Sequence, residues 1–354
     1  MRFKKNPMPP LIIPVFLPSL GCRERCLFCN QKATAEGLPS PSSVRSSIEA
    51  SLDGIPYDKK NRKKQVAFYG GSFTAIHRDD QVRYLKEVQP FLAPGLIDSI
   101  RISTRPDALD EEILSLLKEY GVKTVEVGVQ SMIDEVLALA NRGHCAKDAV
   151  DVVHRLKNSN LEVGLQLMIG LPGDTCDLFL HTLDQVIELK PDFVRIHPTL
   201  VLEGTPLEIL WRGGRYSPLR LDEAVQWLKK GILRLENSSL PVARIGLQPT
   251  KELERDFLAG PYHPAFRQLV DSAIFFDMAT SLLQVSQKNG QALFFCHPKE
   301  VSNLRGQKNE NILKLRDRFN LKEIFVQQRE DVSRGSLVLQ TSTGNVLINR
   351  KALC

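Results

Sequence analysis

Short apolar runs alternate with amphipathic segments from Leu11 to Ile196. Each run is followed by a polar or glycine-rich turn, and each turn by a segment whose apolar residues recur at helical spacing. The runs predict strands at Leu11–Leu17, Gln65–Tyr69, Ile97–Ser103, Lys123–Val129, Leu161–Ile169 and Phe193–Ile196. The segments between them predict helices at Pro41–Leu52, Asp79–Leu92, Ala108–Tyr120, Asp134–Ala140, Lys147–Asn158 and Thr175–Leu189.

This repeated order of strand, turn and helix predicts an α/β fold with a parallel sheet and right-handed crossovers. We expect a partial (β/α)6 barrel, although periodicity alone also allows an open doubly wound sheet. In both architectures ligands bind where the strands end. Turns that are far apart in the sequence can therefore meet at one rim.

After Pro198 the regular alternation stops. We expect a loop at Trp211–Tyr216, helices at Arg220–Leu235 and Phe266–Gln287, and a break between these helices at Gly260–Pro264. The remainder predicts short strands and one basic helix, at Ala292–Cys296, Ile312–Phe319, Glu323–Val326, Ser336–Leu339 and Val346–Ile348. This change predicts two domains, a core at residues 1–253 and a small α+β appendage at residues 254–354.

The net charge of +6 is concentrated at the end of the chain, where residues from Lys288 onward carry twelve Lys and Arg against six Asp and Glu. A second basic run lies at Lys59–Lys64. Such charge attracts polyanions, nucleic acid first, although a charge run alone is more often a solvated face. No apolar run reaches membrane-spanning length and no signal peptide is recognised. We therefore expect a cytoplasmic protein without membrane contact.

Three cysteines, Cys22, Cys26 and Cys29, follow the first predicted strand at C-x3-C-x2-C spacing. Three thiolates on one short loop can hold three corners of an iron–sulfur cube, and one iron then stays open. Half of a zinc site and inert thiols are the alternatives, but the chain has no second C-x2-C. The other cysteines are isolated: Cys145, Cys176, Cys296 and Cys354.

The cysteine loop after the first strand and the Gly70-Gly71 turn after the second resemble the radical S-adenosylmethionine (SAM) superfamily. Further blocks are similar, in the same order, to the radical domain of the Elongator complex catalytic subunit. They are Thr104–Asp107, Glu126–Ser131, Asn141–His144, Pro198–Val201, Gly204–Trp211 and Gly214–Tyr216. The Gly-Val-Gln-Ser and Gly-Leu-Pro-Gly stretches also resemble, more distantly, oxygen-independent coproporphyrinogen oxidase.

The resemblance implies a radical SAM type of partial barrel in which Cys22, Cys26 and Cys29 hold a 4Fe-4S cluster. The open iron would bind the amino and carboxylate groups of S-adenosyl-L-methionine. One electron, from a donor such as flavodoxin or ferredoxin, would cleave this cofactor to methionine and a 5′-deoxyadenosyl radical. That radical would take a hydrogen atom from the substrate, while the protein supplies position and excludes water.

The resemblance also assigns residues at the strand ends to the cofactor. Gly70, Gly71 and Ser72 match the turn that receives the methionine ammonium group; without the cysteines they would be an ordinary strand-to-helix turn. Gln130 is expected at the ribose or carboxylate, and Arg142 at the methionine carboxylate. The remaining expected cofactor contacts are Ser103, Arg105, Gln166 and Gly170.

Other chemically capable residues have a simpler interpretation. His144 and His197 are expected to be hydrogen-bonded structural histidines, and Asp174 a helix cap. Cys145 and Cys176 are expected to pack without a catalytic role.

Two departures limit what the resemblance implies. Leu253–Cys354 shows no acetyl-CoA signature, and the cysteine spacing is the common superfamily form rather than the longer Elongator form. The favoured hypothesis is therefore a radical SAM enzyme that acts on RNA, such as a tRNA base, with the basic tail contacting phosphates. Radical chemistry on a small molecule such as a tetrapyrrole, and a non-catalytic iron–sulfur or zinc protein, stay open.

Overall fold

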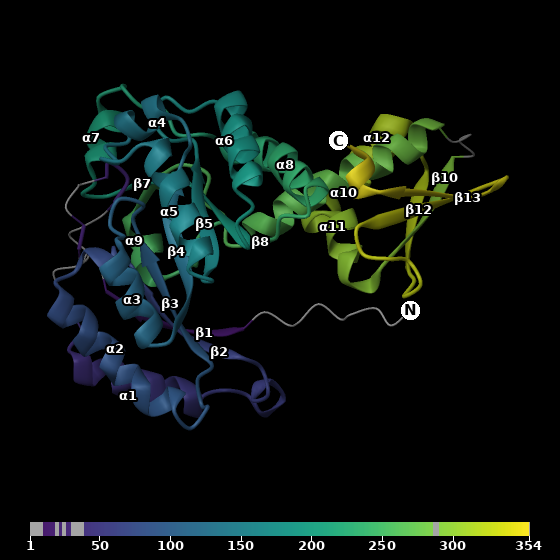
Figure 1. Cartoon of the computed structure of the whole chain (residues 1–354). Coiled ribbons are helices and arrows are strands. Elements are labelled where there is room, and N and C mark those ends of the chain that lie inside the picture. Colours follow the sequence, from purple (N-terminus) through teal and green to yellow (C-terminus); the bar gives the residue numbers. More distant parts are fainter. Residues whose placement is uncertain (1–9, 18–20, 23–25, 30–38, 286–289, 354) are drawn as a thin grey trace.

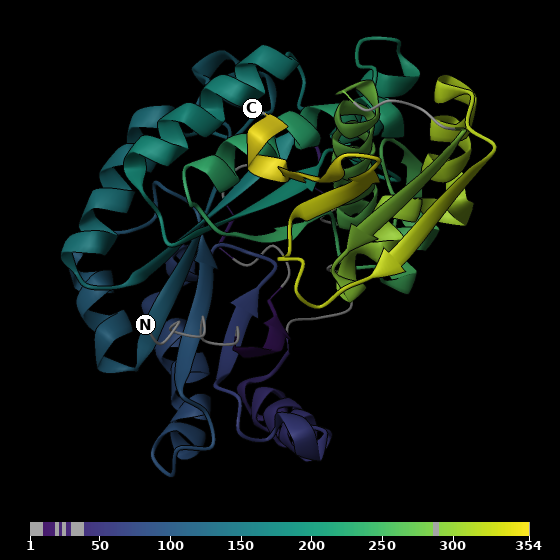
Figure 2. The same cartoon turned by 90° about the vertical axis from the view of Figure 1, so that its right-hand side faces the viewer.

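The computed structural model describes residues 10–17, 21–22, 26–29, 39–285 and 290–353. Its main sheet has seven parallel strands in the order β1-β2-β3-β4-β5-β6-β8 and curves into a half-barrel (Figures 1 and 2). The strands are β1 Leu11–Phe16, β2 Lys64–Tyr69, β3 Ser99–Thr104, β4 Val122–Gln130, β5 Glu162–Ile169, β6 Phe193–Pro198 and β8 Val242–Ile245. The predicted partial barrel is confirmed.

Helices cover the outer, convex side of this sheet (Figure 2). They are α1 Pro41–Asp53, α2 Arg78–Leu92, α3 Glu111–Glu119, α5 Ala146–Asn158, α6 Cys176–Leu189 and α8 Leu221–Asn237. The short helix α4 (Asp134–Leu139) lies instead at the end of the strands, where Val136 packs with Leu171 (Figure 1). Several begin at the side-chain caps that helix starts prefer; Ser40, for example, accepts the N–H of Ser43 at 3.1 Å. Each helix predicted before Leu189 is present, with ends shifted by a few residues.

The seventh strand, β8, was missing from the prediction. It has only four residues, of which only Ile245 is buried, so it lacks the apolar run that marks the other strands. Its place is defined by pairing with β6, where Arg195 lies opposite Arg244. The predicted loop at Trp211–Tyr216 was wrong at its start, because α7 (Pro206–Arg212) extends through Trp211.

The two faces of the half-barrel differ in polarity. Side chains alternate between the faces of a strand, and the convex set is apolar: Phe68, Ile100, Ile102, Val125, Leu165 and Val194 are all buried beneath the helices. The concave set is polar and includes Tyr69, Arg101, Glu126, Gln166, Arg195 and Arg244. The core thus lies on one side of the sheet, and the other side is available for ligands.

The C-terminal part contains a second sheet of four strands in the order β11-β10-β12-β13, packed against α10 and α12. Its elements are α10 Phe266–Val285, β10 Gln291–Cys296, α11 Val301–Arg305, α12 Glu310–Phe319, β11 Glu323–Gln328, β12 Ser336–Thr341 and β13 Gly344–Asn349. Apart from the short helix α11, which was not predicted, these match the predicted elements. Arg350 joins the chain end to α8 and α10, with Nε 2.8 Å from Glu236 Oε2 on α8 and Nη2 3.0 Å from Asp271 Oδ1 on α10.

A small two-stranded sheet lies at the proposed domain boundary. Its strands are β7 (Val201–Leu202) and β9 (Phe257–Ala259), and α9 (Lys251–Asp256) precedes β9. The boundary after residue 253 stays a prediction. Among the described residues, no helix has the length and apolar character needed to cross a bilayer.

Candidate active site

The loop that follows β1 lies against the turn that follows β2. Gly21 has a φ of +75°, and a Cβ at this position would lie 2.3 Å from the carbonyl oxygen of Ser72. Glycine satisfies both the left-handed backbone and this close approach. The cysteine loop is therefore held beside residues 70–72, as two turns after neighbouring parallel strands should be.

Backbone hydrogen bonds fix the second half of the cysteine loop. The N–H of Leu27 donates to the carbonyl of Ala140 at 3.2 Å, and the carbonyl of Leu27 accepts the N–H of Leu207 at 2.8 Å. Cys26 is buried, whereas Cys22 and Cys29 are partly exposed. The loop is thus anchored to the ends of α4 and α7, with its thiols at the rim of the half-barrel.

Arg142 follows α4 and directs its guanidinium group at the cysteine loop. Nη1 donates to the Sγ of Cys26 at 3.0 Å, and Nη2 donates to the carbonyl oxygen of Gly128 at 2.6 Å. The side chain is buried, and its Nε has no hydrogen-bond partner among the described residues. Arg142 thus places a positive charge in direct contact with the Cys26 sulfur.

The surroundings of Cys22 act in opposite directions on its ionisation. Burial raises the pKa of the Cys22 thiol, and the charge of Cys26 raises it further. The backbone N–H of Ser72 and the guanidinium groups of Arg105 and Arg142 oppose this rise. Two cations beside two thiols suit a site whose ligands must be thiolates.

Ser72 and Arg105 join the turns after β2 and β3. The Oγ of Ser72 shares a hydrogen bond of 3.1 Å with Thr104 Oγ1 and accepts the backbone N–H of Arg105 at 3.1 Å. Arg105 donates to both carboxylate oxygens of Asp107, each at 2.9 Å. Its Nη1 is buried and without a hydrogen-bond partner among the described residues. That nitrogen is the part of Arg105 that is left to meet a ligand.

Gln130 is turned toward the rim by an irregularity of β4. Its φ is +70°, and the pairing of β4 with β5 shifts register between Gly128 and Gln130. The side chain is buried, yet its Oε1 has no partner in the part of the chain that the structure describes. A buried amide oxygen without a partner is costly, and a ligand donor would satisfy it. Gln130 therefore offers a buried hydrogen-bond acceptor that a cofactor could use.

The turn after β5 is closed by contacts within the protein. The N–H of Gly170 donates to Asp174 Oδ2 at 2.9 Å, and its carbonyl oxygen accepts the hydroxyl of Tyr216 at 2.7 Å. Burial raises the pKa of Asp174 to about 7, against the effect of its backbone hydrogen bonds. The prediction that Asp174 caps a helix was wrong, because Thr175 caps α6 through the N–H of Leu178. Asp174 instead fixes the turn.

Gln166 and His197 meet on the concave face. Gln166 Nε2 lies 3.1 Å from His197 Nδ1. Burial, together with repulsion from Arg195 and Arg244, lowers the pKa of His197 to about 4. The imidazole is therefore neutral at physiological pH. Gln166 holds this histidine as well as lying at the predicted cofactor position.

A buried charged network occupies the centre of the concave face. Glu126 accepts hydrogen bonds from Arg101 and, at 2.9 Å, from the hydroxyl of Tyr69, and its other oxygen lies 3.0 Å from Arg195 Nε. Ser103 is partly exposed beside it, in register with Glu126. The sequence pattern did not mark these residues as a network. Its signal was the polar residues inside otherwise apolar strands, which also fit strands with one solvated face.

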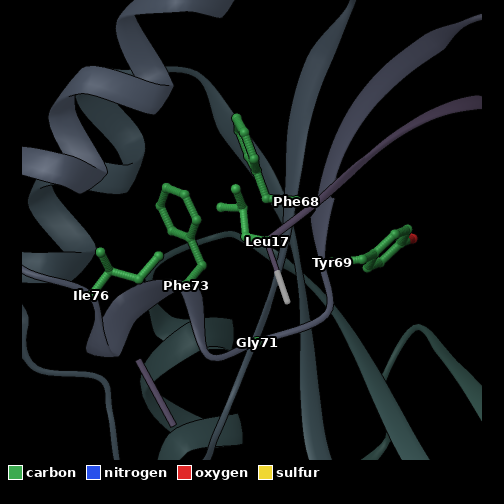
Figure 3. A pocket seen from close by; sticks show the side chains of 6 residues that line it. All are labelled: Leu17, Phe68, Tyr69, Gly71, Phe73 and Ile76. Carbon is green, nitrogen blue, oxygen red and sulfur yellow. The ribbon is translucent and has the colours of Figure 1, made fainter. Parts of the chain in front are cut away.

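The Gly70-Gly71 turn directly follows β2, whose last residues point to opposite sides of the sheet. Figure 3 shows Leu17, Phe68, Phe73 and Ile76 gathered on one side of β2, while Tyr69 points to the other side. The apolar side chains support the turn from the convex side. Tyr69 therefore lies on the concave face directly before Gly70.

The histidine and cysteines interpreted as structural have local contacts. His144 Nε2 lies 3.3 Å from the carbonyl oxygen of Val129, and burial, with repulsion from Arg142, lowers the pKa of His144 to about 4. Cys145 Sγ donates to Asp148 at 3.3 Å at the start of α5, and Cys176 is the first residue of α6.

The side chains at the cysteine loop fit a cluster with a bound nucleoside better than a single metal ion. Among the described residues, no three metal-ligating side chains lie close enough together for a single metal ion. A cube instead places its thiolates at separate corners. Four buried polar atoms on residues at or after the ends of β3 and β4 have no hydrogen-bond partner among the described residues: Arg105 Nη1, Gln130 Oε1, Arg142 Nε and His144 Nδ1. Arg142 contacts Cys26, and the charges of Arg105 and Arg142 act on Cys22. Thiols with unsatisfied polar atoms beside them fit such a group.

Two family models match the chain in succession, the Radical SAM superfamily over residues 16–186 and the Radical_SAM C-terminal domain over residues 191–275. The chain is 38% identical over 204 residues to a tRNA uridine(34) acetyltransferase of Methanocaldococcus jannaschii, which covers 56% of this chain and 38% of that protein. It is also 38% identical over 135 residues to Elongator complex protein 3 of Mus musculus, covering 36% of this chain and 24% of that protein. The chain thus spans well under half the length of these relatives.

A solved structure shares the fold. The archaeal Elp3 of Methanocaldococcus infernus, with an N-terminal deletion, superposes with a TM-score of 0.59 at 23% identity. The superposition covers 76% of this chain and 63% of that one. The half-barrel, the cysteine loop on its rim and the two successive family matches lead to one conclusion: the chain belongs to the radical SAM superfamily of enzymes.

Proposed function

We propose that this protein cleaves S-adenosyl-L-methionine reductively at a 4Fe-4S cluster and uses the resulting radical to modify RNA, with tRNA as the substrate class. The observation that carries the proposal is the contact of Arg142 with Cys26, in a rim where further buried polar atoms lack partners among the described residues. When bound, the cluster and SAM supply an electron and a carbon-centred radical that abstracts hydrogen. The residues of this chain would hold the cluster and position SAM and the substrate.

Cys22, Cys26 and Cys29 would hold the cluster. Arg142 would orient the Cys26 sulfur toward the cluster, because its Nη1 donates directly to that sulfur. The fourth iron would then stay open to SAM, since no fourth cysteine belongs to this loop.

Two groups of residues would position SAM. The backbone of Gly70 and Gly71 can accept the ammonium group, because glycine permits close approach. Gln130 Oε1 and Arg105 Nη1, both without partners among the described residues, offer one acceptor and one donor for the rest of the molecule. Ser72, Ser103, Gln166 and Gly170 would contribute through the turns and the concave face.

The RNA substrate is supported by the relatives and by charge. Two of the similar proteins are a tRNA uridine(34) acetyltransferase and Elongator complex protein 3. The excess positive charge of this chain lies after Lys288, where it can contact phosphates. Acetyl transfer is not part of the proposal. A cytoplasmic location and an electron donor of the flavodoxin or ferredoxin class complete it.

The experiment is anaerobic reconstitution with iron and sulfide, followed by dithionite and SAM, with 5′-deoxyadenosine measured with and without bulk tRNA. We expect product in both cases and faster formation with tRNA. No 5′-deoxyadenosine from the reconstituted protein would overturn the radical chemistry. Formation that is indifferent to tRNA, together with no salt-dependent affinity for tRNA, would overturn the RNA assignment and favour a small-molecule substrate.

A further inference from the structure

A groove separates the edge strand β8 from the start of α10. Its volume is about 410 Å³, which lies within the roughly 300–1,000 Å³ typical of small-molecule sites. Its polar lining is Arg244, Arg267, Gln268, Asn303 and Asp271, and the carboxylate of Asp271 is already paired with Arg267 and Arg350. The groove therefore has room for a nucleotide-sized group between the half-barrel and the C-terminal part.

Arg244 connects this groove to the concave face. It lies opposite Arg195 in the pairing of β6 with β8, so both side chains belong to the same face of the sheet. Its Nη2 donates to Gln248 Oε1 at 2.6 Å and its Nε to the carbonyl oxygen of Gly246 at 3.2 Å. Both partners are neutral. Within the described residues, Arg244 forms no ion pair with a carboxylate.

The charges of this face do not balance. Arg101 and Arg195 share the carboxylate of Glu126, and Glu162 Oε2 is 3.8 Å from Arg101. Arg244 is then left in excess. Partial burial lowers the pKa of Arg244, and repulsion from Arg195 lowers it further. A bound anion would relieve this repulsion.

We propose that Arg244, which lines the groove and lies opposite Arg195 on the concave face, binds a backbone phosphate of the RNA substrate. A guanidinium fork matches phosphate oxygens in geometry and charge. The groove also borders α10 and α11, which lead into the basic C-terminal part. An RNA strand that runs from the basic C-terminal part along the groove would pass Arg244. This inference rests on the proposed RNA function and adds the contact that positions the substrate.

The test is the salt dependence of bulk tRNA binding to the reconstituted full chain. Each phosphate contact contributes roughly 0.7–0.9 to the slope of log K against log salt. We expect Arg244→Gln to weaken binding severalfold and reduce the slope by about one contact, and Arg244→Lys to retain most of the slope. The matched control is Arg83→Gln on α2, an exposed arginine paired with Asp80, which should leave both values unchanged.

A second variant keeps the test sharp if Arg244→Gln folds poorly, as judged by thermal unfolding. Gln268→Glu adds to the groove a second carboxylate, beside the already paired Asp271, and should weaken tRNA binding at least threefold at low salt, because like charges repel. Normal tRNA binding by both folded variants would overturn this inference and leave the proposed function intact. No salt-dependent tRNA affinity in the unmodified protein would overturn the RNA function and this contact with it.

Discussion

The two faces of the seven-stranded sheet use the same strands for opposite purposes. Residues that point to the convex side, such as Phe68 and Leu165, are at most 1% exposed and pack beneath the helices. Their immediate neighbours, Tyr69 and Gln166, point to the concave side and are hydrogen-bonded to other polar side chains. Adjacent residues of one strand therefore serve different roles: one packs in the apolar core and the next belongs to the polar concave face.

The polar concave face can hold a buried charge because it supplies partners for that charge. Glu126, buried at 2% exposure, is acceptable because Arg101, Arg195 and Tyr69 surround it. A buried charge without such partners would be expelled or neutralised. The concave face thus holds an internally paired network, at the rim of which the cysteine loop and Gln130 lie.

The largest expected effect is at the rim itself. We expect Cys26→Ala to abolish the broad iron–sulfur absorption and the formation of 5′-deoxyadenosine together, because two thiolates cannot hold the cluster. The protein should stay folded, since the loop is anchored through Leu27. The matched control is Cys176→Ala, at the start of α6, which should retain both signals. Cleavage of SAM by folded Cys26→Ala would contradict the ligand assignment.

The next largest effect should come from breaking the concave network. Glu126→Gln removes the carboxylate that Arg101 and Arg195 share. We expect a loss of about 3–5 kcal/mol in the free energy of unfolding, because two partly or fully buried guanidinium groups lose their counter-charge. Urea titration measures this loss. Glu162→Gln, at a half-exposed carboxylate 3.8 Å from Arg101, should cost under about 1 kcal/mol.

A pair of neighbouring substitutions compares the two faces directly. Phe68→Leu should cost about 2 kcal/mol of unfolding free energy, at roughly 0.8 kcal/mol for each buried carbon removed. Tyr69→Phe should cost a similar amount, about 1–3 kcal/mol, because Glu126 and Arg195 lose a partner. Only the second should slow turnover with tRNA. Equal loss of turnover in both variants would remove the functional distinction between the faces.

Much of the site could be predicted because its signals are local. The spacing of Cys22, Cys26 and Cys29, and the Gly70-Gly71 turn, depend on residues close together in the sequence. The contact between Arg142 and Cys26 joins residues 116 positions apart, and only the fold brings them together. Resemblance located Arg142 at the site but did not predict its sulfur contact.

The features that sequence reasoning missed have a physical reason. A single polar residue inside a strand fits both a buried network and a solvated face, so Arg101 and Arg195 gave no distinct signal. Strand β8 is short and contains Arg244, so it lacked the apolar run on which strand prediction depends. Asp174 preceded a helix as a cap would, but the backbone of Gly170 was its partner.

The smallest expected effect is a pH dependence on the concave face. His197 has its pKa lowered to about 4 by burial and by Arg195 and Arg244, so the folded protein keeps it neutral. In the unfolded chain, with a pKa near 6.5, it takes up a proton as the pH falls. Its contribution to stability is therefore present above pH 6.5 and is lost as the pH falls toward 4.

His197→Gln isolates this contribution, since glutamine keeps a hydrogen-bonding group beside Gln166 but does not titrate. We expect the stability of the unmodified protein relative to this variant to fall by about 1–2 kcal/mol between pH 7 and pH 5, as measured by urea unfolding at each pH. Comparison with the variant cancels the opposite trend from Asp174, whose raised pKa of about 7 stabilises the fold as the pH falls. A relative stability that does not change with pH would contradict this prediction, because it would mean that His197 takes up a proton in the folded protein as readily as in the unfolded chain.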